Sequence, residues 1–493
     1  MAEAKIDVER LFRAWPSLRE IFDRLGRAGH DVALVGGVVR DAILAELAGE
    51  EFEPKEIDLA TSASPSEIKR LFPGWRAIEV GEAFGVLRLV APDGHEYEVA
   101  TYRREADYDG RRPGEVEPAA SLEEDLKRRD LTINGLAARA DGRVIDLVGG
   151  LGDLRERLIR TIGDPEERFS EDYLRIIRAI RFACLIDGRL TPEVSAAIRR
   201  NGAKLLLISW ERLRDELFKV LETPRAARGI RLLDEHGLLE LLLPEVVATK
   251  GVRQPEKYHP EGDVYTHTLL ALEVADRLGF EPLVKFAILL HDIGKPVAFE
   301  RNGGQHMGGH ELIGEKQAEE VCRRFRLSND QIKVIKYLVR EHLRVAKLPE
   351  MTRPRQIRFI QEAAAGPGAS SAHLPALARK FPLFFKLLQL LIADCEASIH
   401  RASGWLPVLQ TFVGLLPELK RLEELEAAHK LLDGHDLLAL GLAEGPEVGR
   451  ILEAVYDQIL SGKVQSREEA LELAREMVAK VKNLPSEPGK AYP

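Results

Sequence analysis

The sequence predicts a multi-domain α+β protein, in which an N-terminal mixed α/β domain with a small sheet precedes domains built only from helices. Three observations support this fold class. The chain has 493 residues, enough for roughly three or four domains, and 45% of them are hydrophobic. Strand and helix patterns alternate in the N-terminal third, and strand signals fade after residue 166. Residues 251–262, with glycine, two prolines and charged residues, are typical of a linker. We therefore expect domains at 1–165, 166–250, 251–400 and 401–493.

Cysteine usage and hydropathy indicate the compartment. The three cysteines, Cys184, Cys322 and Cys395, lie far apart and form no Cys-x-x-Cys pair, which argues against a disulfide framework and a zinc ribbon. The N-terminus lacks a signal pattern, and no apolar run reaches the length of a transmembrane helix. We expect a cytoplasmic protein without a membrane partner; a homo-oligomer is left open.

Charge is unevenly distributed along the chain. A net charge of −9 argues weakly against a nucleic-acid partner. Basic residues nevertheless cluster at 127–129, at Arg175, Arg178 and Arg181, and at 199–204. A solvated helix face is the more common explanation of any single cluster, but such stripes also bind RNA backbones. The charge pattern therefore permits an RNA partner without establishing one.

The first element that points to chemistry is a glycine turn. Residues 11–25 have helical apolar spacing, and an apolar strand is expected at 31–35. Gly36 follows the strand, and Gly37-Val-Val-Arg-Asp41 opens a helix whose free backbone amides suit a phosphate. An ordinary strand-to-helix connection would use the same glycines.

A second expected strand, 56–61, carries two carboxylates. Glu56 and Asp58 share a face, because side chains two residues apart in a strand point to the same side. Beside a phosphate-binding turn, they could hold two Mg²⁺ ions that align a triphosphate with an attacking hydroxyl. An exposed acidic strand is the simpler alternative.

A hairpin with the turn Pro92-Asp-Gly94 is expected next, joining strands at 84–90 and 95–102. Glu96 and Glu98 share a face of its second strand, and one of them could supply a third carboxylate to the metal site. We favour Glu98, because Val-Ala-Thr-Tyr-Arg follows it directly.

The mixed domain ends in a polar segment, a helix and a strand. Residues 103–116 show no apolar periodicity and predict a mobile loop of the kind that closes over substrates; Arg111 and Arg112 within it are candidate RNA contacts. Ser121 with Glu124 predicts a capping box and a helix, and 144–147 predicts a short strand.

The next part is expected to be all helical. The sequence from Glu171 predicts a helix start at which Asp172 and Arg175, three residues apart, project side by side. An acceptor beside a forked donor can pair with the Watson–Crick edge of a base, although a surface ion pair is the more common reading. Residues 232–242 predict a single apolar helix.

The third expected domain holds imidazoles and carboxylates on successive helices. Such side chains are ligands for first-row transition metals, and the full ordered set favours a site for one or two metals over packed or surface histidines. The candidates are His267, His291, Asp292, His310, His342 and Asp394.

The remaining helices are rich in leucine and glutamate. They are interrupted at 432–436 and at 444–449, where a Gly-Pro pair opens a helix whose amides could hold an RNA phosphate. A plain helix break explains the same pair.

Several spaced motifs, in order, resemble the bacterial class II tRNA nucleotidyltransferases, which comprise the CCA-adding and A-adding enzymes and their poly(A) polymerase relatives. They cover residues 30 to about 220, and a metal-binding HD domain and a helical tail of the family's type follow. The motifs are Gly36-Gly-Val-Val-Arg-Asp41, Glu56-Ile-Asp-Leu-Ala-Thr61, Arg128-Arg-Asp-Leu-Thr-Ile-Asn134, Asp146 with Gly149-Gly150 and Asp153-Leu154, Glu171-Asp-Tyr-Leu-Arg175 and Ser209-Trp-Glu-Arg212.

The resemblance implies a nucleotidyltransferase head, a neck and body, an HD phosphohydrolase and a tail that contacts tRNA. It implies Mg²⁺ at Glu56 and Asp58, CTP and ATP as substrates, and the tRNA 3′ end as acceptor. It also implies Ni²⁺, Co²⁺ or Mn²⁺ in the HD domain, which acts on phosphates at RNA ends. The implied nucleotide-binding residues are Gly36, Gly37, Arg40, Asp41, Arg128, Asp130, Asn134, Glu171, Asp172, Arg175 and Arg178, with Arg181 and Arg212 as further RNA contacts.

One departure from the family is Glu56, where Asp is usual, so the metal site carries an extra methylene. A full 103–113 segment favours a product that includes adenosine, because enzymes limited to cytidine are thought to lack it. CCA addition, A addition and poly(A) synthesis stay open. A protein-modifying uridylyltransferase and a non-catalytic RNA-binding protein are the rival classes; the former lacks the motifs at 128–134 and 171–175.

Overall fold

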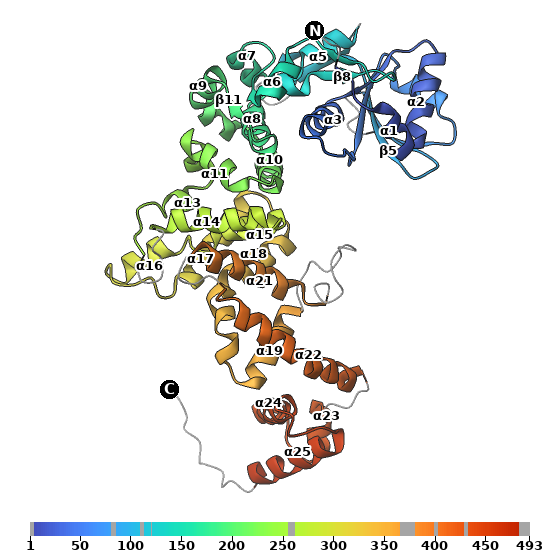
Figure 1. Ribbon diagram of the computed structural model, residues 1–493. Coiled ribbons are helices and arrows are strands. Elements are labelled where there is room, and N and C mark those ends of the chain that lie inside the picture. Colours follow the sequence, from blue (N-terminus) through green and yellow to red (C-terminus); the bar gives the residue numbers. More distant parts are fainter. Residues whose placement is uncertain are drawn as a thin grey trace. The chain divides into compact units, whose positions relative to one another are not determined.

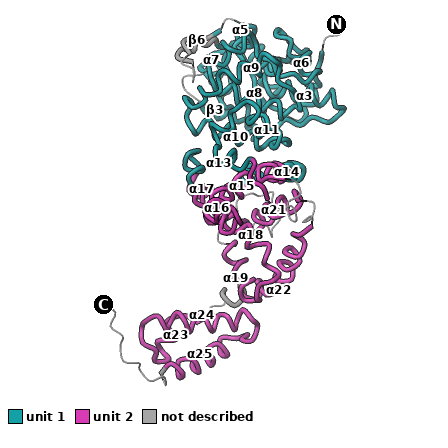
Figure 2. Tube along the Cα trace, turned by 90° about the vertical axis from the view of Figure 1, so that its left-hand side faces the viewer, with its two compact units in different colours: residues 1–250, 272–286, 320–327 teal, residues 251–271, 287–319, 328–493 magenta. Residues whose placement is uncertain are grey.

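The computed structural model describes residues 4–79, 85–108, 113–119, 121–254, 262–364, 380–398, 403–427 and 432–482. The chain divides into two compact units (Figure 2). Unit 1 comprises Met1–Lys250, Leu272–Phe286 and Glu320–Leu327, and unit 2 comprises Gly251–Ala271, Ala287–Glu319 and Ser328–Pro493. The expected boundaries at 165 and 400 stay predictions.

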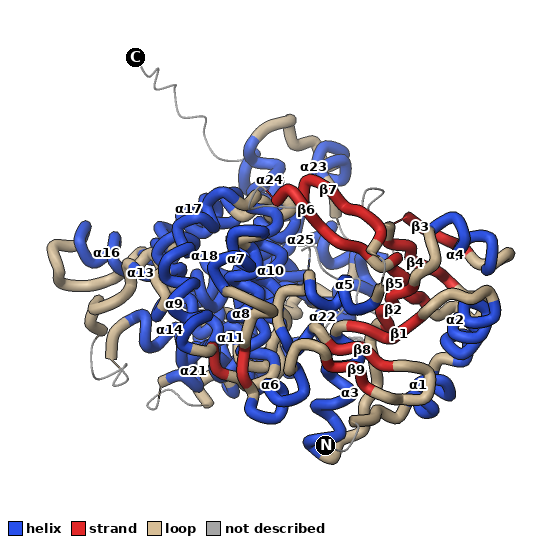
Figure 3. Tube along the Cα trace, turned by 90° about the horizontal axis from the view of Figure 1, so that it is seen from above, coloured by secondary structure: helices blue, strands red, loops and turns tan. Residues whose placement is uncertain are grey.

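Within the described residues, the N-terminal part of unit 1 forms a mixed sheet of seven strands (Figure 3). Every neighbouring pair is antiparallel except β2 and β5, which run parallel. In sheet order the strands are β3 (Arg76–Glu79), β4 (Val86–Val90), β5 (Glu96–Thr101), β2 (Ile57–Thr61), β1 (Val32–Val35), β8 (Leu136–Ala138) and β9 (Val144–Asp146).

The expected N-terminal helix is two helices, α1 (Val8–Ala14) and α2 (Pro16–Arg27). They separate at Trp15, because the residue before a proline is disfavoured in the helical conformation. Tyr97 of β5 and Ser17 of α2 share a buried hydrogen bond of 2.7 Å. Since successive side chains of a strand alternate, α2 covers the face of the sheet opposite to Glu98.

The other helices of the mixed domain are α3 (Gly37–Ala48), α4 (Pro65–Leu71), α5 (Leu122–Lys127) and α6 (Gly150–Glu156). The side chain of Ser121 caps α5 by accepting from the amide of Glu124, as the sequence indicated. Near α5, a buried cluster closes the core on one side of the sheet: Ala33, Val35, Ala60, Tyr102, Leu122, Leu126 and Ala137.

The prediction of an irregular loop at 103–116 was wrong over most of its length. Strands β6 (Arg103–Tyr108) and β7 (Pro113–Pro118) pair antiparallel, with Arg103 opposite Pro118 and Tyr108 opposite Pro113. Backbone pairing in a two-stranded ribbon does not need an apolar face, so the search for apolar alternation missed it. Arg111 and Arg112 lie outside the described residues.

Helices make up most of the remainder of unit 1, but two expectations need correction. A short parallel pair, β10 with β11, interrupts the part expected to be all helical. The single helix expected at 232–242 is broken at Gly237, whose φ of 74° ends one helix and begins the next. The elements are β10 (Leu158–Ile159), α7 (Pro165–Glu171), α8 (Leu174–Leu185), β11 (Arg189–Leu190), α9 (Pro192–Asn201), α10 (Trp210–Glu222), α11 (Ala226–Glu235), α12 (Leu238–Leu242) and α13 (Pro244–Val247).

The rest of the chain is helical where it is described (Figure 1). No helix in the described ranges is long and apolar enough to cross a membrane. The helices are α14 (Val264–Arg277), α15 (Pro282–Leu290), α16 (Lys295–Arg301), α17 (His310–Arg324), α18 (Asn329–Ala346), α19 (Arg353–Ala364), α21 (Pro382–Ala397), α22 (Leu406–Ala427), α23 (Gly434–Ala439), α24 (Pro446–Leu460) and α25 (Arg467–Lys482).

Candidate active site and candidate metal centre

Three carboxylates gather at the parallel pair β2 and β5. The register sets Asp58 directly opposite Glu98, and Glu56 precedes β2 in an exposed position. Burial raises the pKa of Asp58 to about 7, and the negative charges of Glu98 and Glu56 add to the rise. Crowded carboxylate oxygens of this kind are the donors that Mg²⁺ prefers, so the residues fit such a metal.

The choice between Glu96 and Glu98 is settled geometrically. Glu98 lines the largest cavity of unit 1, together with Glu56 and Asp58. Glu96 lies outside that lining, at an ion-pair distance of 3.9 Å from Arg88 of β4. The strand alternation that paired the two glutamates in the sequence therefore brings only Glu98 to the other carboxylates.

The glycine turn lies against the carboxylates. Gly36 has a φ of 71°, and a Cβ there would lie 3.3 Å from Nη1 of Arg129 and 3.6 Å from Oδ2 of Asp58. Only glycine allows both this backbone conformation and this close approach. Helix α3 starts at Gly37, so its first free amides border the cavity, which both glycines line.

Arg40 is a buried hub behind this turn. Its Nε donates to Asp41 at 2.7 Å, and its Nη1 donates to Oδ1 of Asn134 at 2.9 Å. Arg40 and Asn134 line the cavity, whereas Asp41 lies outside the lining and serves to hold Arg40. The sequence had grouped all three as nucleotide-binding residues.

Asp130 is fully buried between two parts of unit 1. Its carboxylate accepts from Nε of Arg178 at 2.7 Å and from Nδ2 of Asn134 at 3.2 Å. Burial alone would raise the pKa of Asp130, but the charges of Arg178 and Arg175 outweigh it and hold the pKa far below its usual range. Asp130 is therefore ionised and ties α8 to the sheet domain.

Two residues near Arg128 were missed by the sequence reasoning. Asp125, which is buried, accepts from Arg128 at 2.8 Å and from Arg129 at 3.2 Å. Arg129 also lies beside Gly36 and opposes the rise in the pKa of Asp58. The neighbouring arginines of the motif were the available signal, but only the turn of α5 reveals which of them approaches the carboxylates.

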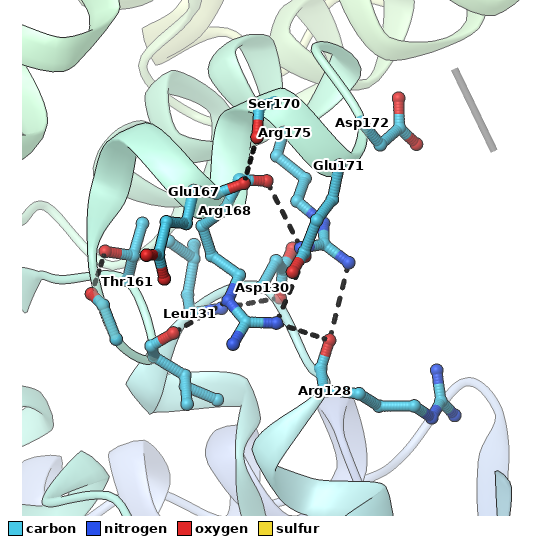
Figure 4. A network of polar contacts seen from close by, with 12 residues as sticks. Arg128, Asp130, Leu131, Thr161, Glu167, Arg168, Ser170, Glu171, Asp172 and Arg175 are labelled. Atoms are coloured by element: carbon cyan, nitrogen blue, oxygen red, sulfur yellow. Dashed lines mark hydrogen bonds and ion pairs between the residues drawn. The ribbon is translucent and has the colours of Figure 1, made fainter. Parts of the chain in front are cut away.

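The expected template residues lie at a helix break (Figure 4). Helix α7 ends at Glu171 and α8 begins at Leu174, so Asp172 occupies the junction with an extended backbone. The prediction of one helix with Asp172 beside Arg175 was therefore wrong. Two consecutive helices of different direction replace it, because the carboxylate of Asp172 accepts from the amide of Leu174 at 3.0 Å and caps the second helix.

Each template side chain has its own partner. Glu171 pairs with Arg175 and, at 3.1 Å, with Arg168, while Asp172 accepts from Arg212 of α10 at 2.6 Å. Figure 4 shows the carboxylate of Asp172 apart from the guanidinium of Arg175. Asp172, Arg175 and Arg212 all line the cavity, so a base could meet both carboxylate and guanidinium there.

Three guanidinium groups converge on Phe182, a residue that the sequence reasoning did not single out. Arg181, Arg40 and Arg178 lie 4.4, 4.9 and 5.6 Å from its ring centroid. Burial lowers the pKa of Arg181 to about 10, and the adjacent carboxylate of Glu216, 3.0 Å away, opposes this effect. Arg181, expected to contact RNA, is thus built into the cavity wall.

All these side chains belong to one cavity of about 1010 Å³. Among the described residues, its lining holds ten basic and six acidic side chains. The basic ones are Arg40, Lys55, Arg103, Arg128, Arg129, Arg175, Arg178, Arg181, Arg212 and Lys219, and the acidic ones are Glu56, Asp58, Glu98, Asp130, Asp172 and Glu222. Glu171 stays outside the lining and holds Arg175 from behind.

The six candidate metal ligands of unit 2 are brought together. All are buried, and His267 shares a hydrogen bond of 2.9 Å with Asp394. Oδ2 of Asp292 lies 3.2 Å from Nε2 of His291, and Oδ1 lies 3.2 Å from Nε2 of His310. Nε2 of His291 is buried without a hydrogen-bond partner among the described residues, so a divalent metal fits the donor set.

Electrostatics in this centre favour neutral imidazole beside ionised carboxylate. Burial lowers the pKa of His342 to about 3, and the charge of His291 adds to the effect. Burial alone would raise the pKa of Asp292, but His291 and Lys295 outweigh it, so the pKa lies well below its usual value. Neutral imidazole and ionised carboxylate are the forms that bind metals.

Comparison with known proteins follows the same division of the chain. Residues 32–160 match the "Poly A polymerase head domain", residues 189–249 the "Probable RNA and SrmB- binding site of polymerase A", and residues 264–364 the "HD domain". A CCA-adding enzyme of Anoxybacillus flavithermus is 31% identical over 453 residues, which is 92% of this chain and 94% of that protein. The chain belongs to the tRNA nucleotidyltransferase family.

Other members of this family differ in how far they match. The A-adding tRNA nucleotidyltransferase of Deinococcus radiodurans is 34% identical over 71% of this chain and 78% of its own length. The CCA-adding enzyme of Bacillus licheniformis is 45% identical, but the match spans 48% of this chain and only 56% of that enzyme.

The fold agrees with solved structures of the family. The CCA-adding enzyme of Bacillus stearothermophilus in complex with CTP matches with a TM-score of 0.67 and 26% identity, over 95% of this chain and 99% of that one. The head domain and the HD domain of a tRNA nucleotidyltransferase both imply the use of divalent metals.

Proposed function

We propose that this protein is a template-independent tRNA nucleotidyltransferase that adds CCA, or its terminal A, to tRNA 3′ ends from CTP and ATP. The observation that carries the proposal is a single cavity lined by the carboxylates Asp58 and Glu98, the glycine turn at Gly36, and the pair Asp172 and Arg175. Metal-binding, phosphate-binding and base-reading groups thus surround one space large enough for a nucleotide and an RNA end.

The roles follow from the chemistry of each wall. Glu56, Asp58 and Glu98 would hold two Mg²⁺ ions, which supply charge neutralisation for the triphosphate. Gly36 and Gly37 would place backbone amides against the phosphates. The remaining polar walls would bind phosphate, ribose or base through Arg40, Arg128, Asp130, Asn134, Asp172, Arg175 and Arg178, with Arg181 and Arg212 beside the RNA end.

The reaction is a nucleotidyl transfer. The 3′-hydroxyl oxygen of the RNA forms a bond with the α-phosphorus, the bond between the α-phosphorus and the bridging oxygen breaks, and pyrophosphate leaves while the hydroxyl proton is released. Positioning the hydroxyl in line with the leaving group, and surrounding the phosphates with fixed positive charge, supply most of the rate enhancement.

A tRNA that ends at the discriminator base tests the proposal. With separate labelled CTP and ATP, we expect incorporation of both nucleotides. ATP incorporation only into tRNA that already ends in CC would identify an A-adding enzyme, and long adenosine tracts would identify a poly(A) polymerase. Labelling of protein instead of tRNA, or of neither, would favour the uridylyltransferase or the non-catalytic rival.

A second activity is proposed for the HD centre, as a phosphodiesterase or phosphatase that uses Ni²⁺, Co²⁺ or Mn²⁺. The buried histidines and carboxylates around Asp292 favour it, because bound transition metals lower the pKa of water and polarise phosphoryl oxygens. Hydrolysis of bis-p-nitrophenyl phosphate with each of these metals supplied is the test. Absence of hydrolysis with all three would indicate a structural domain.

A further inference from the structure

The HD centre divides into two ligand groups around one carboxylate. His267, His291 and Asp292 offer ligand atoms that all lie within 4.8 Å of one another, and so do Asp292, His310 and His342. The two oxygens of Asp292 face different groups. Oδ2 lies 3.2 Å from Nε2 of His291, whereas Oδ1 lies 3.2 Å from His310 and 3.8 Å from His342.

Hydrogen bonds fix the tautomers of the histidines. Nδ1 of His291, His310 and His342 lies 2.7, 2.9 and 2.6 Å from the carbonyl oxygens of Ile288, Met307 and Val339. A carbonyl oxygen only accepts, so each Nδ1 carries the hydrogen and each neutral ring presents a lone pair at Nε2. This is the arrangement by which proteins orient metal-binding imidazoles.

The second group is then a set of lone pairs facing one another. Nε2 of His310 and Nε2 of His342 are 3.2 Å apart, and both approach Oδ1 of Asp292. No hydrogen is available between the two nitrogens, so the contact repels unless a cation lies between them. Two nitrogens bound at 2.0–2.1 Å to one metal are separated by roughly 3.0–3.4 Å, which matches the observed spacing.

We propose that the HD centre holds two divalent transition-metal ions bridged by the carboxylate of Asp292. His267, His291 and Asp394 complete the first position with Oδ2, and His310 and His342 complete the second with Oδ1. This inference rests on the proposed metal centre and adds its nuclearity. Phosphate esters are the substrate class for such a pair, since two metals can bind both the attacking and the leaving oxygen.

Lys295 keeps the two oxygens of Asp292 divided. Its Nζ donates to Oδ2 of Asp292 at 2.5 Å and to Oε1 of Gln254 at 2.6 Å. Because Lys295 is buried and held from both sides, it fixes the rotation of the carboxylate. Oδ1 therefore stays turned toward the second group.

Gly294 positions the second group. A Cβ at this residue would lie 2.2 Å from the carbonyl oxygen of His310 and 2.6 Å from the amide nitrogen of Gly314. The turn after Asp292 thus lies directly against the start of α17, and any side chain at residue 294 would displace His310. Gly294→Ala should consequently remove the second ion while leaving the first ligand group intact.

Metal counting on the full-length protein tests the proposal. The chain is stripped with a chelator, reconstituted with Ni²⁺ in excess Mg²⁺ to keep the carboxylate site of the head occupied by Mg²⁺, dialysed, and measured by inductively coupled plasma mass spectrometry. We expect two Ni²⁺ per chain in the wild type and in Asp58→Ala. We expect one in Gly294→Ala, His310→Ala and His342→Ala.

His306→Ala is the matched control, because His306 is exposed and its Nδ1 accepts only from the amide of Gly308. It should keep two ions. Reconstitution with Mn²⁺ gives a second readout: a spin-coupled pair in the paramagnetic resonance spectrum of the wild type, replaced by a single-ion signal in His342→Ala. One ion per wild-type chain would overturn the bridged pair, whereas none would overturn the proposed metal centre itself.

Discussion

Asp58 of β2 lies directly opposite Glu98 of β5, in the parallel register of the two strands. Two carboxylates at this spacing repel, and burial adds to the effect, so the pKa of Asp58 rises to about 7. A divalent cation relieves that repulsion. The pair is therefore the part of the head where metal binding and protein electrostatics are most closely coupled.

The first prediction concerns this pair. Asp58→Ala should abolish nucleotide addition, and Glu98→Gln should slow it by about a hundredfold or more, since each removes a metal oxygen from the centre of charge stabilisation. The measurement is CTP incorporation into tRNA under single-turnover conditions. Glu96→Gln is the control, because Glu96 lies outside the cavity; normal turnover by Asp58→Ala would refute the two-metal assignment.

Glu56 should tolerate change better than Asp58. It precedes β2 and is exposed, so its longer arm can reach the metal from outside the strand and water can replace it. Glu56→Asp should keep activity, and Glu56→Ala should raise the Mg²⁺ concentration at half-maximal rate by about tenfold. A loss in Glu56→Ala as complete as in Asp58→Ala would assign Glu56 an equal role.

The pair between Arg212 and Asp172 should govern base choice. Arg212→Ala removes the donor that lies 2.6 Å from the carboxylate of Asp172, which then loses its fixed orientation toward a base. One such recognition pair is worth about 1–3 kcal/mol, so preference for CTP and ATP over UTP and GTP should fall roughly 5- to 150-fold.

Arg214→Ala serves as the control for that experiment. Arg214 lies on the same helix, pairs with Asp215, and does not line the cavity. Competition assays with all four nucleotides should show unchanged selectivity for this variant. Equal losses of selectivity in both variants would indicate a general effect on α10.

A pH dependence of stability follows from Asp130. Its pKa in the folded chain lies far below the ordinary carboxyl value of 3.8. A depressed pKa contributes stability above that value, and the contribution is lost as pH falls through it, because the unfolded state binds the proton first. Asp130→Asn should therefore be about 3–5 kcal/mol less stable than wild type at pH 7, and the difference should shrink below pH 4.

Urea unfolding at pH 7 and pH 3.5 measures this difference. Asp141→Asn is a suitable control, because Asp141 is exposed and pairs only with its neighbour Arg143. A difference between wild type and Asp130→Asn that stays constant with pH would show that the carboxyl group contributes through packing and not through its charge.

Features that depend on short-range sequence rules were predictable. The glycine turn, the pairing of carboxylates on alternate strand positions and the ordered histidines all follow from local periodicity, and the family-level resemblance added the head, the body and the HD domain. Gly36 illustrates the limit: the sequence predicts its turn, but the approach of Arg129 to within 3.3 Å of its position requires the folded sheet.

Features that depend on long-range contacts were not predictable. Arg178 meets Asp130 across 48 residues, and Arg40 meets Asn134 across 94 residues. Phe182 gathers three guanidinium groups although its own sequence neighbourhood suggests only a core position. The break at Asp172 was missed because a residue that caps a helix and one that lies inside it can have the same neighbours.

The charge of the cavity has a consequence for how RNA approaches. The whole chain carries a net charge of −9, whereas the cavity lining has ten basic and six acidic side chains. A polyanion is therefore repelled by the average surface and attracted by the cavity, and a low-dielectric wall focuses that field. The encounter selects orientation before any base is read: an RNA end that arrives at the cavity is captured, and one that arrives elsewhere is turned away.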